Sequence, residues 1–201
     1  MKKLITLLLV LSALILVPFT NVKASSYLDR IDKYEITIDP NKDGTLDMEF
    51  NIRWTVLDSK TEGPLTWIKI GIPNKYVANI QGTTSNIEKI SYYSDGGSYI
   101  RIDLNREYLA GETLDIGFTY IQSRMYMLHG TECYYNYKPG WFDEIPVTSA
   151  VIKWNKDGVI EADQMSESDG YYVWSSKLNP GETLDINVKY DQSYFRVLNP
   201  D

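Results

Sequence analysis

The sequence has one cysteine, Cys133, and one histidine, His129, among its 201 residues. A single cysteine excludes an intramolecular disulfide, so buried apolar surface has to stabilise the fold. A single histidine excludes a histidine-rich metal site and leaves a Ser-His-Asp triad one candidate base. No Gly-x-Ser-x-Gly motif and no Gly-rich phosphate loop is present. We therefore expect no enzymatic activity, and interpret Cys133 as an unreactive, half-buried thiol and His129 as a surface or packing residue.

Long apolar runs are also missing, except at the start of the chain. Two lysines precede an apolar run over residues 4–19 and a polar stretch that ends at Ala24. This order is typical of a secretory signal peptide, and it predicts cleavage before Ser25. An uncleaved anchor is the alternative, although the run is shorter than the roughly 20 residues of a spanning helix. We expect a secreted or cell-surface protein with no spanning helix after residue 24.

Basic residues are scarce relative to acidic ones, with 20 Lys and Arg against 27 Asp and Glu. Removal of residues 1–24 would take away three lysines and no acid, which leaves 17 basic and 27 acidic residues and a formal charge of −10. Nucleic acids and anionic lipids both require a basic surface, so neither is an expected partner.

Apolar residues alternate with polar ones in several short segments. The clearest segment covers residues 46–56, and similar alternation occurs at residues 68–72, 100–104, 114–120 and 184–190. A period of two is typical of strands with one buried face, and no window after residue 30 has helical spacing. Turn-forming clusters of Gly, Pro, Asn and Asp separate the segments. The pattern predicts an all-β protein made of antiparallel, Ig-like β-sandwich modules.

An internal repeat divides the chain. The segment Gly-Glu-Thr-Leu-Asp-Ile begins at Gly111 and again at Gly181, and each copy is followed by a tyrosine, Tyr120 or Tyr190. A turn that leads into such a strand commonly ends an Ig-like module. We predict a signal peptide over 1–24, a first module over 25–123, a connector over 124–131 and a shorter second module over 132–201. The short second module leaves open that the two share an interface or a strand.

The order of these motifs resembles that of a bacterial family. The residues concerned are the export signal, Asn41-Lys42-Asp43-Gly44-Thr45-Leu46, Tyr120, Tyr137-Lys138-Pro139-Gly140-Trp141-Phe142 and Leu178-Asn179-Pro180-Gly181-Glu182. They are similar to the extracytoplasmic part of predicted membrane or surface proteins that carry paired β-domains of unknown function. The resemblance covers most of the mature chain and implies location and fold only. The sequence departs from the family by showing no C-terminal membrane helix before Asp201.

The segment from Asp39 to Phe50 partly matches an EF-hand calcium loop. Asp39, Asn41, Asp43 and Asp47 stand at loop positions one, three, five and nine, but position twelve, which requires a bidentate carboxylate, is Phe50. The same residues suit a β-hairpin turn that leads into the strand from residue 46. We expect no cofactor, and keep a weak calcium site as the alternative to the plain turn.

Tyrosine is frequent, with 16 residues, and several tyrosines stand in adjacent pairs. Adjacent residues of a strand point to opposite faces, so one ring of each pair leaves the core. The candidate ligand-binding residues are Tyr135, Trp141, Tyr171 and Trp174; Trp54, Trp67 and Trp154 are expected to be structural. We predict a non-catalytic interaction module for a protein or glycan at the cell envelope. The alternatives are a carbohydrate-binding or carbohydrate-active protein, because flat rings match pyranose faces, and an envelope subunit that assembles through edge strands.

Overall fold

The computed structural model describes residues 27–196 and 198, so the expected signal peptide over residues 1–24 lies outside the described part. The described residues form fourteen strands and one short 3-10 turn, η1 (Gln192–Tyr194). The prediction of an all-β protein is confirmed. Within the described part, no helix has the length and apolar character that crossing a bilayer requires.

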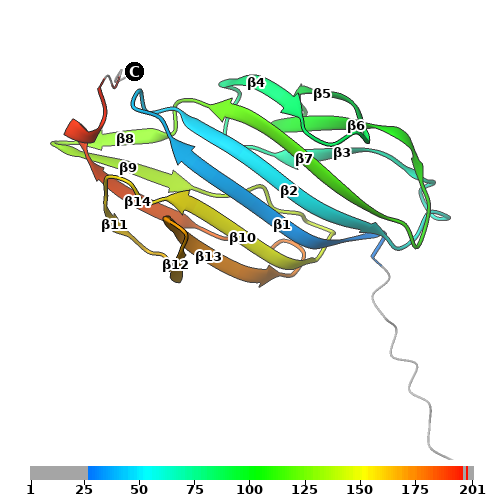
Figure 1. Ribbon diagram of the computed structural model, residues 1–201. Coiled ribbons are helices and arrows are strands. Elements are labelled where there is room, and N and C mark those ends of the chain that lie inside the picture. Colours follow the sequence, from blue (N-terminus) through cyan, green and yellow to red (C-terminus); the bar gives the residue numbers. More distant parts are fainter. Residues whose placement is uncertain (1–26, 197, 199–201) are drawn as a thin grey trace, which may run out of the picture.

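Seven strands form one large, curved sheet (Figure 1). In spatial order they are β12 (Ser166–Ser168), β13 (Tyr171–Leu178), β10 (Val147–Asn155), β1 (Asp29–Pro40), β2 (Leu46–Val56), β7 (Thr113–Gln122) and β4 (Val77–Gly82). Neighbours pair antiparallel except β1 and β10, which run parallel with Ile36 opposite Ile152. The sheet therefore joins strands that are far apart in the sequence.

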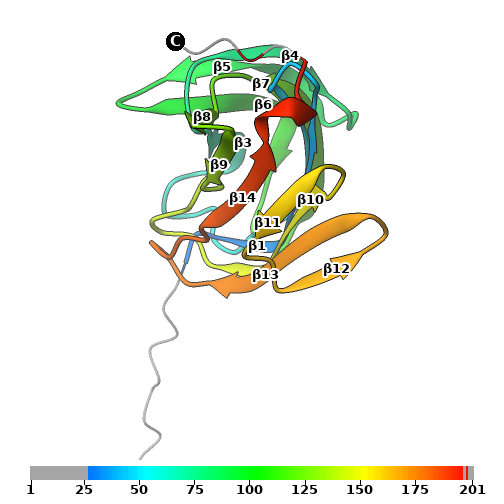
Figure 2. The same ribbon diagram turned by 90° about the vertical axis from the view of Figure 1, so that its left-hand side faces the viewer.

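Two smaller antiparallel sheets cover the large one. The three-stranded sheet consists of β3 (Leu65–Gly71), β6 (Ser98–Tyr108) and β5 (Ile87–Ser94). The four-stranded sheet consists of β11 (Val159–Ala162), β14 (Ile186–Asp191), β9 (Glu132–Tyr137) and β8 (Tyr126–His129). They occupy opposite ends of the long strands and lie on the same side of the large sheet (Figures 1 and 2). One continuous apolar core contains residues from all three sheets.

Strand β2 shows why the large sheet forms. Its even-numbered residues from Leu46 to Val56 are all buried, whereas Asp47, Glu49 and Arg53 are exposed. Phe50 stacks on Phe118 of β7 with ring centroids 4.6 Å apart. The period-two pattern thus buries one face of the sheet and leaves the other face to solvent.

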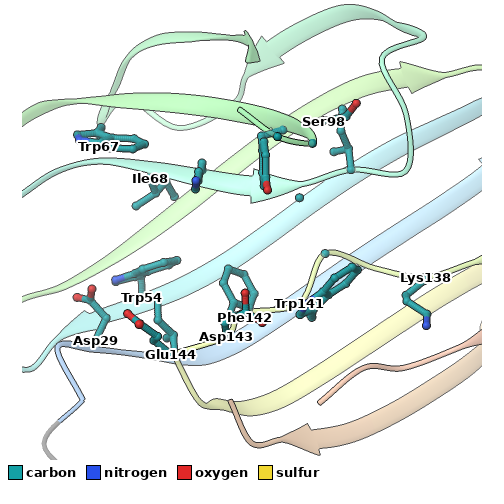
Figure 3. A pocket seen from close by; sticks show the side chains of 18 of the residues that line it. Asp29, Trp54, Trp67, Ile68, Ser98, Lys138, Trp141, Phe142, Asp143 and Glu144 are labelled. Atoms are coloured by element: carbon teal, nitrogen blue, oxygen red, sulfur yellow. The ribbon is translucent and has the colours of Figure 1, made fainter. Parts of the chain in front are cut away.

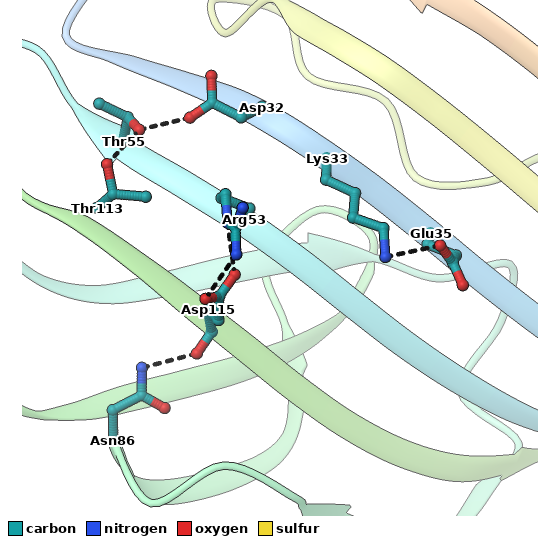
Figure 4. Close-up of polar contacts among 8 residues, drawn as sticks. All are labelled: Asp32, Lys33, Glu35, Arg53, Thr55, Asn86, Thr113 and Asp115. Carbon is teal, nitrogen blue, oxygen red and sulfur yellow. Dashed lines mark hydrogen bonds and ion pairs between the residues drawn. The ribbon is translucent and has the colours of Figure 1, made fainter.

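The solvent face of the large sheet carries polar contacts between neighbouring strands (Figure 4). Arg53 donates two hydrogen bonds to the Asp115 carboxylate across β2 and β7, at 2.8 and 3.1 Å. Thr55 bridges β1 and β7, since its Oγ1 lies 2.5 Å from Asp32 Oδ2 and 2.7 Å from Thr113 Oγ1. The exposed Arg53–Asp115 pair contributes little stability, and these contacts leave the face hydrophilic.

The sheet pairing crosses the boundary expected from the repeat. Strand β1 belongs to the expected first module, over 25–123, and β10 to the second, over 132–201, yet they are hydrogen-bonded neighbours. The expected connector over 124–131 contains β8. The two stretches thus share a sheet and one core, which is the arrangement that the short second module left open.

The two copies of the repeat adopt the same turn. Gly111 and Gly181 both have positive φ, +90° and +78°, which glycine adopts without strain. Each turn connects a strand of one sheet to a strand of another, β6 to β7 in the first copy and β13 to β14 in the second. The repeated motif therefore forms the turn by which the chain passes from one sheet to another.

Candidate functional site

A groove of about 1020 Å³ opens between the three-stranded sheet and the segment of residues 138–145. Strand β3 forms one side of it, with Trp67 and Ile68, as Figure 3 shows. The facing side consists of Trp54 from β2, the start of β1 and the 138–145 segment. Concave sites of this size that combine aromatic and polar side chains are typical binding sites.

Backbone contacts hold the 138–145 segment in place. Gly140 packs directly on Gly71 of β3, so closely that a Cβ at Gly140 would lie 2.4 Å from the Gly71 carbonyl oxygen. The Phe142 carbonyl accepts a 2.9 Å hydrogen bond from Gly181 N, in the second repeat turn. The Phe142 ring meets Trp54 edge to face, with centroids 6.0 Å apart. The segment is thus fixed on both sides of Trp141.

Two tryptophan rings in the groove are accessible. Trp141 is 49% exposed and Trp67 is 39% exposed, although large apolar rings are mostly buried elsewhere in the described chain. The Arg101 guanidinium lies 4.4 Å from the Trp67 ring centroid, in cation–π geometry. Because its neighbours are anchored, Trp141 is held exposed by the fold, which lowers the entropy that a ligand would have to remove.

Four carboxylates line the same groove: Asp29, Glu62, Asp143 and Glu144. None of them forms an ion pair with any described residue. Burial raises the pKa of Asp29, and the Glu62 carboxylate raises it further. The Trp54 indole N–H acts in the opposite direction and lowers the Asp29 pKa, without meeting the carboxylate in standard hydrogen-bond geometry.

The two lysines of the groove are already paired. Lys69 Nζ lies 3.0 Å from Asp95 Oδ2, and Lys138 Nζ lies 3.0 Å from Asp185 Oδ1. Acids outside the groove therefore neutralise the charges of the two lysines. The four groove acids have no such partner among the described residues. The groove consequently presents an excess of negative charge beside exposed aromatic rings, and it suits a ligand with a positive group.

The four residues predicted to bind a ligand lie in different parts of the structure. Trp141 lies in the groove. Tyr135 and Trp174 are buried in the core, where Tyr135 donates a 3.0 Å hydrogen bond to the Gly44 carbonyl and Trp174 Nε1 donates to Asp163 at 2.9 Å. Buried rings offer no face to a sugar, so these two act in packing. Tyr171 is half-buried and donates to Asp39, away from the groove.

The segment that matches a calcium loop forms the β1–β2 hairpin turn, as the plain-turn interpretation predicted. Asn41 N donates to the Thr45 carbonyl at 2.8 Å, and Gly44 has φ +83°. Asp43 Oδ1 accepts from the backbone N and the hydroxyl of Thr45, which lowers the Asp43 pKa. Asp39 accepts from Asn155 and Tyr171. No group of three or more His, Cys, Asp or Glu in the described residues could hold a metal ion.

Cys133 is fully buried in β9 rather than half-buried as expected, because its side chain points into the core, and this burial raises the pKa of its thiol to about 11. A thiol with so high a pKa carries little thiolate at neutral pH. His129 is exposed at the end of β8, next to the turn that leads into β9. Neither residue lines the groove.

Trp67 was expected to be structural. Nothing in the sequence distinguished four acids from the other acidic residues: Asp29, Glu62, Asp143 and Glu144. The alternation in β3 did contain the information about Trp67. Since Ile68 and Ile70 point inward, Trp67 and Lys69 must point outward. The acids come from segments far apart in the sequence, and only the tertiary fold brings them together.

No protein-family model and no curated protein matches the chain. Solved structures of an M1 zinc metallopeptidase from Deinococcus radiodurans, one of them a mutant bound to a Tyr-Ser-Ala substrate, align with TM-scores of 0.47 and 10% sequence identity. The alignments cover 81% and 82% of this chain but only 42% of the peptidase chain. Neither family membership nor activity follows from likeness at this level.

Proposed function

We propose that this protein is a non-catalytic, extracytoplasmic interaction module that binds its ligand in the groove between β3 and residues 138–145. The observation that carries the proposal is the exposed Trp141, held between the anchored Gly140 and Phe142 at the rim of the groove. Rigidly presented aromatic rings dominate the energetics of many binding sites. The export signal expected from the sequence and the resemblance to envelope proteins support a location outside the cytoplasm.

The test is a pair of screens with the purified protein, one on a glycan array and one against a displayed library of heptapeptides. We expect at least one screen to yield a ligand, and Trp141→Ala to weaken its binding roughly tenfold or more. Ile160→Ala is the matched control, because Ile160 is an exposed apolar residue on β11, outside the groove. The proposal fails if neither screen yields a ligand, or if Trp141→Ala binds as tightly as Ile160→Ala.

A carbohydrate-active protein is the second candidate, and the raised pKa of Asp29 is the observation that favours it. Glycosidases use a carboxyl group with a raised pKa as general acid and a second carboxylate as base or nucleophile. Asp29 has three other carboxylates in the same groove. Hydrolysis of an array glycan that is lost in Asp29→Asn would establish this function. Binding without turnover, unchanged in Asp29→Asn, would exclude it for that glycan.

A further inference from the structure

We propose that the occupant of the groove is an extended polypeptide segment carrying a lysine or arginine, which adds to the open edge of β3 as a fourth strand of the three-stranded sheet. This inference rests on the proposed function, because it specifies the ligand class of the same groove. Three observations support it: the hydrogen-bonding direction of β3, the geometry of the groove and its charge.

Within residues 27–196, strand β3 is an edge strand with one side unpaired. Its only partner in the sheet is β6, with Ile68 opposite Ile102 and Ile70 opposite Ile100. Just beyond the strand, Ile72 N donates to Ser98 O at 2.9 Å. In an antiparallel pair, the residues that bond to the partner alternate along the strand. Ile68, Ile70 and Ile72 therefore bond to β6.

It follows that Trp67 and Lys69 direct their N–H and C=O groups away from β6, toward the groove. Neither residue takes part in the described backbone hydrogen bonds outside the strand ladders. Unpaired groups on an edge strand are a template for another strand. At Gly71 the edge is closed by the Gly140 backbone, and the pairing with β6 is irregular between Leu65 and Trp67, so the regular open edge runs from Trp67 to Lys69.

The charge of the groove selects among possible occupants. Four carboxylates without an ion-pair partner among the described residues favour a cationic side chain, as long as the two groove lysines stay paired with Asp95 and Asp185. A second copy of this chain is disfavoured, because its formal charge is −7 and like charges repel. A neutral glycan would leave the β3 backbone groups without their natural partners. An extended basic peptide can hydrogen-bond to the free backbone groups of β3 and can also neutralise the groove carboxylates.

The experiment uses heptapeptides, since seven extended residues span about 23 Å and cover the open part of β3 with residues to spare at each end. The protein is panned against a displayed random heptapeptide library, and the enriched sequences are synthesised for affinity measurement. We expect enrichment of sequences with Lys or Arg, and a loss of affinity of roughly tenfold in Glu144→Gln. Asp47→Asn removes an exposed acid from the opposite face of the large sheet and is the matched control.

Two further measurements test strand addition itself. N-methylation of successive peptide amides should abolish binding at every second position, because only alternate amides of an added strand face β3. Lys69→Pro removes an N–H that faces the groove and spares the bonds to β6, so it should abolish binding while far-ultraviolet dichroism stays unchanged. Lys69→Thr removes the same side chain but keeps that N–H, so the proline variant should bind more weakly than the threonine variant.

The outcomes separate the two proposals. Glycan binding without peptide enrichment would overturn this inference and leave the proposed function intact, whereas no ligand in either screen would overturn both. Enriched peptides without a basic residue, or N-methyl effects without a period of two, would also overturn it. If the protein self-associates as its concentration rises and Lys69→Pro abolishes this association, the groove binds a second copy of the chain. That result would contradict the proposed peptide ligand.

Discussion

Glu112 and Glu182 make the same contact in two turns that lie 70 residues apart in the chain. Glu112 Oε2 accepts a 2.7 Å hydrogen bond from Leu109 N, and Glu182 Oε2 accepts a 2.8 Å bond from Asn179 N. In both turns the glutamate backbone N donates back to the carbonyl of the same partner residue, at 3.0 Å. The sequence repeat is therefore a structural repeat, and the repeated Gly-Glu pair has a turn-stabilising role.

This contact predicts a pH-dependent effect of Glu182→Gln. The backbone N–H of Asn179 is the largest influence that lowers the Glu182 pKa, so the ionised carboxylate stabilises the folded state. That stability is present above the unfolded pKa and is lost as pH falls through the lowered folded pKa. We expect Glu182→Gln to lower the melting temperature at pH 7 and to have a smaller effect near pH 3. Glu88→Gln, at an exposed position of β5, should change little at either pH.

The shared large sheet predicts a single unfolding transition. Because β1 and β10 pair directly, neither of the two expected modules can bury its apolar face alone. Thermal unfolding followed by far-ultraviolet dichroism and by tryptophan fluorescence should give coincident transitions. A fragment of residues 25–123 should remain unfolded. Two separated transitions, or a folded fragment, would instead support independent modules.

Two buried tyrosine hydroxyls should differ in their effect on stability. Tyr135 donates a hydrogen bond to the Gly44 carbonyl, whereas the buried Tyr34 hydroxyl has no hydrogen-bond partner among the described residues. Removing a satisfied hydroxyl costs about 1 kcal/mol, and removing an unsatisfied one is neutral or stabilising. Tyr135→Phe should therefore reduce the free energy of unfolding in urea by about 1 kcal/mol, and Tyr34→Phe should leave it unchanged or increase it. Equal losses in the two variants would contradict this assignment.

Asp29→Asn should stabilise the protein at neutral pH. Burial, the largest cause, and the neighbouring Glu62 raise the Asp29 pKa, so the folded state holds this proton to a higher pH than the unfolded chain does. The favourable contribution of Asp29 is thus present at low pH and is lost as pH rises through its folded pKa. We expect the variant to melt above the wild type at pH 7 and at the same temperature at pH 3. A lower melting temperature at pH 7 would show that the charged Asp29 is stabilising.

An acid that destabilises the fold when ionised is typical of functional sites, where activity and stability compete. If Asp29→Asn stabilises the protein and weakens ligand binding, both results would follow from the same uncompensated charge. The same variant therefore connects the stability of the chain with the use of the groove.

The alternation of side chains made much of the fold predictable. Strand β2 could be found because one of its faces is buried along its whole length, and the hairpin before it because Asp43 and Gly44 suit a turn. No local sequence pattern predicts the parallel pairing of Ile36 with Ile152, because strands that are distant in the sequence meet only through tertiary packing.

The candidate site was predictable only in part. Trp141 was identified by its aromatic character, and Trp67 could have been identified from the inward direction of Ile68. Tyr135 was chosen as a ligand-binding residue because one ring of each adjacent tyrosine pair leaves the core, whereas in β9 the buried residues are Cys133, Tyr135 and Tyr137. The alternation of polar and apolar neighbours therefore predicted which way a side chain points better than the residue type did.

Residue-resolved amide hydrogen exchange along β3 in the ligand-free protein tests the open edge most directly. The edge geometry predicts slow exchange for Ile68, Ile70 and Ile72, whose N–H groups bond to β6, and fast exchange for Trp67 and Lys69. Uniform protection of all five amides would show that another part of the chain already covers this edge, and would contradict the account.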